Sequence, residues 1–87
     1  MDFIKIAEKD GAIMLSDTSG NRALFEFLEF VNIDNTEYAA LVQIDTDDLV
    51  ILSFKENDDG SEVYSTIDDD IVFDKVASVF ESIFNED

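Results

Sequence analysis

Four clusters of turn-forming residues divide this chain into short segments, and their spacing constrains the fold more than any other feature of the sequence. The clusters consist of Asp, Asn, Ser, Thr and Gly and occupy residues 17–21, 34–36, 45–48 and 57–61. Asp and Asn hydrogen-bond nearby backbone in turns, and Gly accepts positive φ. Runs of strand length, rich in β-branched and aromatic residues, cover residues 12–16, 38–44, 49–55 and 62–67. Such short connections favour antiparallel hairpins over parallel crossovers.

Residues 21–33 fit two interpretations. An apolar set with spacings of three and four fits the helical period of about 3.6 residues: Leu24, Phe25, Leu28 and Val31. Phe25 and Phe27 instead fit the two-residue period of a strand, but that alternation breaks at Leu28. We therefore expect a long strand with a bulge or bend near Leu28, and a helix is the alternative.

The last segment has apolar residues at spacings of three and four, which is typical of an amphipathic helix. They are Ile71, Val72, Val76, Val79, Phe80 and Ile83. We expect a C-terminal helix over residues 69–85, with Asp68 or Asp69 as its N-cap. Glu86 and Asp87 oppose the helix dipole, which predicts fraying at that end.

Together these elements predict an α+β fold in one small acidic domain, residues 1–87. It is an antiparallel β-meander of about five strands with one C-terminal α-helix packed on one face. Residues 1–9 are expected to form an N-terminal arm. The strands over 38–44 and 49–55 are apolar on both faces, so the helix leaves one face uncovered. The arm, a second copy or another protein would cover it, and we favour the arm together with a weak homodimer.

The charge balance limits the function. The 22 acidic and 5 basic residues give a net charge of −17, and the chain has neither His nor Cys. Zinc sites of the Cys or His kind, Cys nucleophiles and His acid–base chemistry are therefore excluded. Carboxylate pairs are unavoidable in so acidic a chain, so they do not indicate catalysis. We expect a protein that is not an enzyme and needs no cofactor.

The acidic turns raise the question of a calcium site. Counting back from Gly60 puts Lys55 at the first EF-hand position, and counting from Asp17 puts Arg22 where Gly is required. No EF-hand fits. A looser divalent-ion site at Asp45, Asp47 and Asp48, or at residues 68–70, is the alternative. We assign no metal, since a solvated turn or a helix cap is the better explanation of these residues. As an acidic surface for a partner, the candidate residues are Asp45, Asp47, Asp48, Asp58, Asp59, Asp68, Asp69 and Asp70.

The same charge indicates the kind of partner. A dense negative field repels nucleic acid and anionic membranes and attracts basic surfaces. No apolar run reaches the roughly 20 residues that span a bilayer, and the N-terminus does not resemble a signal peptide. We therefore expect a cytoplasmic interaction or accessory module that binds a basic protein, without direct nucleic-acid or membrane binding. The alternative is a nucleic-acid mimic that inhibits a DNA- or RNA-processing enzyme.

The order of these segments resembles that of a known family. The matching stretches run Ile-Met-Leu-Ser-Asp-Thr-Ser-Gly-Asn-Arg (13–22), Phe-Glu-Phe-Leu (25–28), Glu-Tyr-Ala-Ala-Leu (37–41), Leu-Val-Ile-Leu (49–52) and Asp-Asp-Asp (68–70). In this order and spacing the chain resembles the YrzB-like small acidic proteins of the Bacillota, over about residues 12–84. Arg22 stands where that family usually has Glu.

The resemblance implies a strand over residues 22–33 and no activity, because the family has no established one. Its genes often neighbour a gene for a nuclease similar to Holliday-junction resolvases. That association implies a partner that processes nucleic acid.

Overall fold

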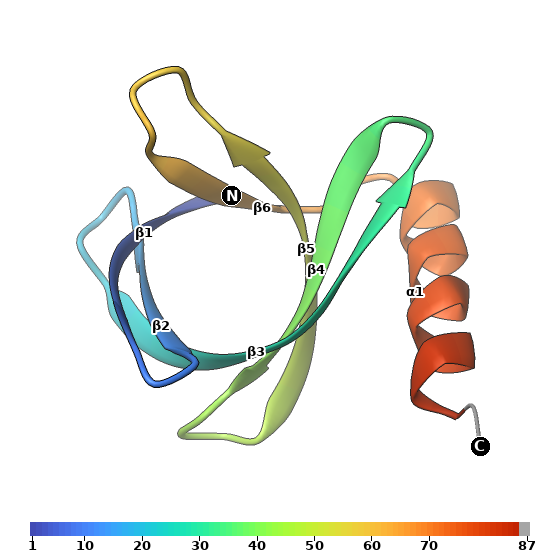
Figure 1. The fold of residues 1–87 in the computed structure, drawn as a ribbon, viewed down its shortest axis with the longest axis horizontal. Coiled ribbons are helices and arrows are strands. Elements are labelled where there is room, and N and C mark those ends of the chain that lie inside the picture. Colours follow the sequence, from blue (N-terminus) through green and yellow to red (C-terminus); the bar gives the residue numbers. More distant parts are fainter. Residues whose placement is uncertain (86–87) are drawn as a thin grey trace.

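Six consecutive strands and one C-terminal helix make up the computed structural model, which describes residues 1–85 (Figure 1). The elements are β1 (Asp2–Lys9), β2 (Ala12–Asp17), β3 (Arg22–Ile33), β4 (Thr36–Gln43), β5 (Asp48–Glu56), β6 (Glu62–Thr66) and α1 (Asp70–Phe84). Each strand pairs antiparallel with the next. This confirms the α+β meander with a C-terminal helix. The fraying predicted at Glu86 and Asp87 lies outside the described residues.

The N-terminal segment is a strand rather than an arm, so the sheet has six strands where about five were expected. β1 pairs with β2, and its first residues also pair with β6, with Phe3 opposite Tyr64. Asp10 and Gly11 connect β1 to β2 at φ angles of 54° and 84°. An Asp-Gly pair suits such a tight hairpin turn, and the sequence analysis missed this signal. Pairing of β1 with β6 closes the meander into a barrel.

Aliphatic and aromatic side chains fill the barrel interior. At its centre Leu15, Leu41 and Leu52 are at most 1% exposed. Phe25 and Ala39 are buried beside them in the same cluster. Each fully buried Leu contributes about 1.5–3 kcal/mol relative to an exposed one, so this cluster is a main source of stability.

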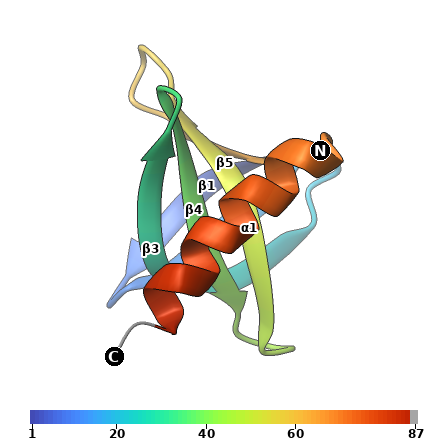
Figure 2. The ribbon, with the colours of Figure 1, turned by 90° about the vertical axis from the view of Figure 1, so that its right-hand side faces the viewer.

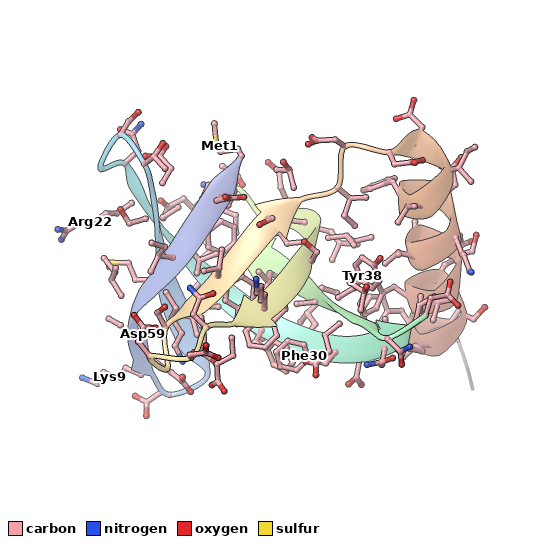
Figure 3. The ribbon with its side chains drawn as sticks, turned by 90° about the horizontal axis from the view of Figure 1, so that it is seen from above. Met1, Lys9, Arg22, Phe30, Tyr38 and Asp59 are labelled. Atoms are coloured by element: carbon pink, nitrogen blue, oxygen red, sulfur yellow. The ribbon has the colours of Figure 1, made fainter. Side chains whose placement is uncertain are left out.

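The helix α1 covers the outer face of the sheet and crosses β3, β4 and β5 obliquely (Figure 2). Val76 and Phe80 of α1 are at most 1% exposed and form a cluster with Tyr38 and Ala40 of β4. In Figure 3 the Tyr38 side chain lies between the barrel and the helix. The expected apolar stripe is thus the face that docks on the sheet.

The helix α1 begins directly after Asp69, one of the two N-cap residues expected from the sequence. Asp69 Oδ1 accepts hydrogen bonds from the backbone N–H groups of Ile71 at 2.8 Å and Val72 at 3.2 Å. Those N–H groups have no intrahelical partner, so the carboxylate satisfies them. Of the two expected caps, Asp69 and not Asp68 takes the role. In the described part of the chain no helix is long and apolar enough to cross a lipid bilayer.

The second apolar face of the central strands is the barrel interior. Along β4, Ala39 and Leu41 belong to the interior cluster, whereas Tyr38 and Ala40 belong to the cluster beneath α1. Closure of the sheet therefore covers the face for which a second copy was invoked. A weak homodimer stays a prediction, but the uncovered face no longer supports it.

Two bulges interrupt the alternation of side chains. The β3–β4 register shifts between Phe27 and Glu29, which confirms the bulge expected at Leu28 and excludes the helix. The β1–β2 register shifts in the same way between Lys5 and Ala7. A bulge adds one residue to a strand, so residues three apart on either side of it point to the same face.

Candidate functional site

The eight acidic residues proposed as a partner surface are exposed but do not form one group. Three of them, Asp45, Asp47 and Asp48, lie at the β4–β5 turn. Asp58 and Asp59 lie in the β5–β6 turn, and residues 68–70 join β6 to α1. Figure 1 shows these three connections at separate places around the molecule. Within residues 1–85, no three carboxylates are arranged to hold a metal ion.

Two of these acids have local structural roles. Asp69 is the helix cap described above. Asp59 Oδ1 accepts hydrogen bonds from the Oγ and backbone N–H of Ser61, at 2.7 and 2.9 Å. The Ser61 hydroxyl and N–H stabilise the ionised carboxyl and thereby lower the pKa of Asp59. Turn and cap chemistry accounts for both positions.

A different set of side chains converges at one end of the barrel, which we call the mouth. Four aromatic rings form a continuous row there, from Phe27 through Phe30 and Phe54 to Tyr64. Successive ring centroids are 4.5, 5.1 and 5.1 Å apart. Tyr64 is buried at 3% exposure, Phe27 and Phe54 pack against the interior cluster, and Phe30, within the row, is 39% exposed to solvent.

The bulges create this arrangement. The Leu28 bulge puts Phe27 and Phe30 on the inner face of β3, where their rings meet. The bulge at Ile6 does the same for Lys5 and Glu8 of β1, whose charged groups lie 2.7 Å apart. Both pairs then line the same hollow, of about 310 Å³, together with Tyr64. Bulges are often found beside functional sites because they redirect side chains in this way.

Charged side chains surround the aromatic row. The Lys5 ammonium also pairs with the Glu62 carboxylate of β6. The hydrogen bonds to Glu62 and Glu8 raise the pKa of Lys5 well above its usual value, so it stays charged. Burial raises the pKa of Tyr64 to about 12, so its phenol stays neutral at physiological pH. The inner part of the mouth therefore holds one cation between two carboxylates.

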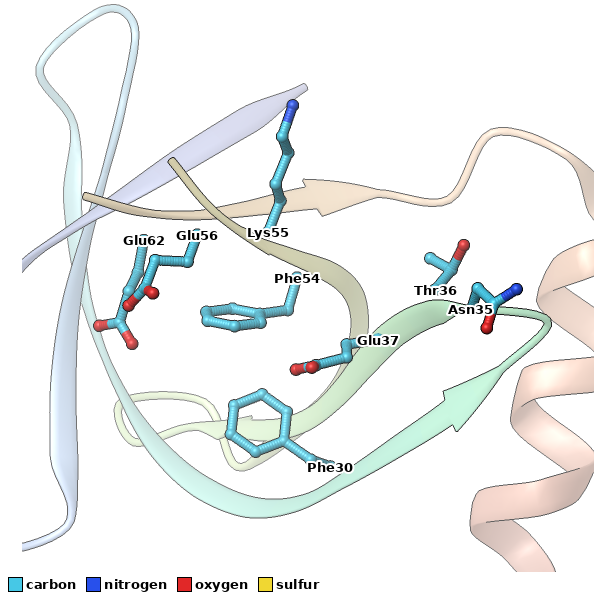
Figure 4. Close-up of a pocket in the computed structure, with 8 residues that line it drawn as sticks. All are labelled: Phe30, Asn35, Thr36, Glu37, Phe54, Lys55, Glu56 and Glu62. Atoms are coloured by element: carbon cyan, nitrogen blue, oxygen red, sulfur yellow. The ribbon is translucent and has the colours of Figure 1, made fainter. Parts of the chain in front are cut away.

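The outer part of the mouth is a larger hollow of about 600 Å³, which shares Phe30 and Glu62 with the inner one. In Figure 4 the carboxylates of Glu37, Glu56 and Glu62 extend toward the space beside the Phe30 and Phe54 rings. The Lys55 ammonium, by contrast, points away from the rings. Three carboxylates thus face two partly exposed aromatic rings, and one of them, that of Glu62, is already paired with Lys5.

This arrangement is suited to binding a cation. Aromatic ring faces attract Lys and Arg head groups, and nearby carboxylates add to that attraction. The apolar stem of the same side chain can lie along the rings. The mouth has no His or Cys, because the chain contains neither.

Sequence analysis identified the acidic character but not this site. None of the eight predicted aspartates lines the mouth hollows, which are bordered instead by glutamates and aromatic residues. The available signal was the pair Phe27 and Phe30, which a bulge at Leu28 brings to one face. That pair identifies the site only once it is known that β1, β5 and β6 meet β3 at this end of the barrel.

Comparison with known proteins identifies relatives along most of the chain. Residues 19–85 match a family described as "Protein of unknown function (DUF1292)". A UPF0473 protein of Heliobacterium modesticaldum is 38% identical over 82 residues, which cover 92% of each chain. A UPF0473 protein of Desulforudis audaxviator is 37% identical over 73 residues, covering 79% of this chain and 83% of the relative. No solved structure is significantly similar.

A UPF0473 protein of Clostridium botulinum (strain Okra / Type B1) is 32% identical over 77 residues, covering 86% of this chain and 92% of the relative. These relatives, from Heliobacterium and Clostridium, confirm the resemblance to the uncharacterised YrzB-like proteins of the Bacillota. None of the matched descriptions indicates a catalytic activity. On this evidence, the chain belongs to the DUF1292 family of proteins of unknown function.

Proposed function

We propose that this protein is a non-enzymatic cytoplasmic module that binds a basic protein partner through the mouth. The observation that carries the proposal is the pair of carboxylates of Glu37 and Glu56 beside the Phe30 and Phe54 rings, next to Glu62, which is already paired with Lys5. A Lys or Arg side chain of the partner would place its stem on the rings and its charge among the carboxylates. The net charge of −17 would speed the encounter with such a partner.

The mouth favours this function over general charge attraction. A solvated acidic turn gives a cation nothing but screened Coulomb attraction. The mouth adds aromatic faces and a hollow of about 600 Å³, large enough for a long side chain. Phe30 is 39% exposed, so its ring is available to a ligand without any rearrangement of the core.

The test is the binding of a fluorescein-labelled nonapeptide of alternating Arg and Ala, measured by fluorescence anisotropy. Two double variants remove the same charge from different places. Glu37→Gln with Glu56→Gln changes the mouth, and Asp45→Asn with Asp47→Asn changes the remote β4–β5 turn. We expect the mouth variant to bind about tenfold more weakly, from roughly 0.7 kcal/mol per lost contact. The turn variant should stay within about twofold, because its charges act only through screened long-range attraction.

The same anisotropy measurement distinguishes binding at the mouth from the alternative function, which is mimicry of nucleic acid. A mimic of nucleic acid presents many carboxylates in a phosphate-like array and binds through their sum. Both double variants would then lose affinity equally. Equal losses would contradict the mouth as the binding site and would favour the mimic. Phe30→Ala sharpens the distinction further, because it weakens mouth binding without any change in charge.

A further inference from the structure

The strand β3 is longer than its neighbour β2, so part of its edge is unpaired. The β2–β3 ladder ends where Ala12 lies opposite Glu26, and one more hydrogen bond joins Phe27 N–H to the Gly11 carbonyl at 3.4 Å. β3 then continues to Ile33, with β4 on its other edge. In the described part of the chain no strand pairs with the outer edge of residues 28–33.

The Phe30 backbone shows which groups face this free edge. Its N–H donates to Oε1 of the neighbouring Glu29, at 3.1 Å, and so has a local partner in place of a strand. Backbone groups alternate between the two edges of a strand, so the N–H and C=O of Asn32 also face outward. An exposed row of this kind is a template for another strand, and a charged side chain on the edge is a common way to protect it.

We infer that this free edge of β3 binds an extended basic peptide as an added strand that continues the line of β2. The inference rests on the proposed function, because the peptide is the basic segment that the mouth receives. Strand addition supplies affinity through backbone hydrogen bonds, while pockets for alternate side chains supply specificity. Residues 28–33 offer an edge about 20 Å long, enough for five or six peptide residues.

The geometry joins the edge to the mouth. Phe30 lies on this stretch of β3 and lines both hollows of the mouth. A peptide residue opposite Phe30 would point to the same face, toward the outer hollow that Phe30 lines together with Glu37 and Glu56. The next residue would point to the other face, beside Val31, which is apolar and half-buried. The edge thus selects a peptide in which cationic and apolar residues alternate.

Charge decides between a basic peptide and a second copy of this chain. Two copies paired edge to edge would each contribute a net charge of −17 and would bring their Glu29 side chains near one another. Like charges across adjacent strands destabilise pairing. A cationic strand has the opposite effect, because Glu29 can leave the Phe30 N–H and pair with a peptide Arg or Lys.

The experiment uses a labelled heptapeptide with the sequence Arg-Val-Arg-Val-Arg-Val-Arg and two methylated forms. One carries N-methyl groups on its three Val residues, and the other carries them on three Arg residues. In an added strand, all Arg N–H groups point to one edge and all Val N–H groups to the other. Methylation of the set that faces β3 should weaken binding by about 100-fold, since three hydrogen bonds are lost. The other methylated peptide should bind within about threefold of the parent.

Each outcome has a defined meaning. Equal binding of the two methylated peptides would overturn the added strand. If, in that case, the Glu37→Gln, Glu56→Gln variant still bound both methylated peptides more weakly than the wild-type protein does, the proposed function would stand without the added strand. Should that variant bind the parent peptide as well as the turn variant does, both proposals fail.

A second measurement follows the edge itself. Amide hydrogen exchange at Phe30 should slow by at least about tenfold when the unlabelled parent peptide saturates the protein. Unchanged exchange would overturn the inference. Sedimentation of the free protein tests whether a second copy of the chain occupies the edge instead. A dimer in which the Phe30 amide is protected without peptide would assign the edge to that second copy and overturn the inference.

Discussion

Strands β3, β4 and β5 present aromatic rings on both faces, and the two faces use them differently. On the outer face, Phe80 of α1 is 1% exposed and packs against Tyr38 and Ala40. On the inner face, Phe30 is 39% exposed and stands within the aromatic row, between Phe27 and Phe54. The helix layer uses its aromatic side chain for stability, whereas the mouth leaves one accessible to a ligand.

The charges beside the rings differ in the same way. The cluster beneath α1 consists of apolar residues and Tyr38. The mouth combines rings with Lys5, Glu8 and Glu62, and Lys5 is held by both carboxylates. Ionic groups beside partly exposed rings add little to folding, because surface ion pairs contribute about 0–1 kcal/mol. The comparison teaches that rings of one chemical type contribute very differently to folding in the two layers, and the following changes test that difference.

The largest effect is expected beneath the helix. Phe80→Ala should lower the free energy of unfolding by about 3–5 kcal/mol, because it removes a fully buried ring and leaves a cavity. Urea denaturation followed by circular dichroism measures this. A loss below about 1 kcal/mol would show that α1 is not docked through Phe80.

The second effect concerns Tyr64, where the aromatic row meets the core. Burial raises the pKa of Tyr64 to about 12, above the roughly 10 of an unfolded chain. The fold therefore favours the neutral phenol, and this stabilisation is complete below about pH 10 and is lost as the pH rises toward 12. Unfolding measured at both pH values should show a loss of about 2–3 kcal/mol. In the Tyr64→Phe variant the part of this pH-dependent loss that is due to Tyr64 should vanish. If the variant lost as much unfolding free energy between the two pH values as wild type does, the raised pKa of Tyr64 would not be its cause.

The third effect concerns the start of the helix that covers the outer face. Asp69→Ala removes the acceptor for the N–H groups of Ile71 and Val72 and should cost about 1 kcal/mol. Asp68→Ala is the matched control, with the same loss of charge one residue earlier, and should cost less than about 0.5 kcal/mol. Thermal melts of both variants give the comparison. Equal losses would mean that net charge rather than capping is responsible.

The smallest effect on stability is expected at the mouth. Phe30→Ala should lower the free energy of unfolding by about 1 kcal/mol or less, since the ring is partly exposed and a cavity there can fill with water. The same substitution in the buried layer, Phe80→Ala, provides the direct comparison in urea denaturation. If Phe30→Ala destabilised the fold as strongly as Phe80→Ala, the mouth would be part of the core instead of a site.

Local sequence patterns predicted most of the elements. The turn clusters, the amphipathic helix and the break at Leu28 depend on neighbouring residues, and all agree with the structure. The first strand was missed because the turn at Asp10 and Gly11 was not recognised. The bulge at Ile6 had no comparable signal, since no periodic pattern surrounds it to be broken.

The candidate site was less predictable for a physical reason. Acidic residues are frequent in the turns, so sequence reasoning assigned the partner surface to aspartates such as Asp45 and Asp58. The mouth instead collects Glu8 from β1, Glu37 from β4 and Glu62 from β6. Side chains so far apart in sequence become neighbours only through strand register.

The sequence by itself determined the strands β2 to β6 with the turns between them, the helix with its apolar face and the strongly negative charge, because each follows from local conformational preference or simple composition. Only the tertiary structure decided what covers the second face of the sheet. Pairing of β1 with β6 turned that face into a barrel interior. Closure is a long-range event that depends on the register of all six strands at once, so no single segment encodes it.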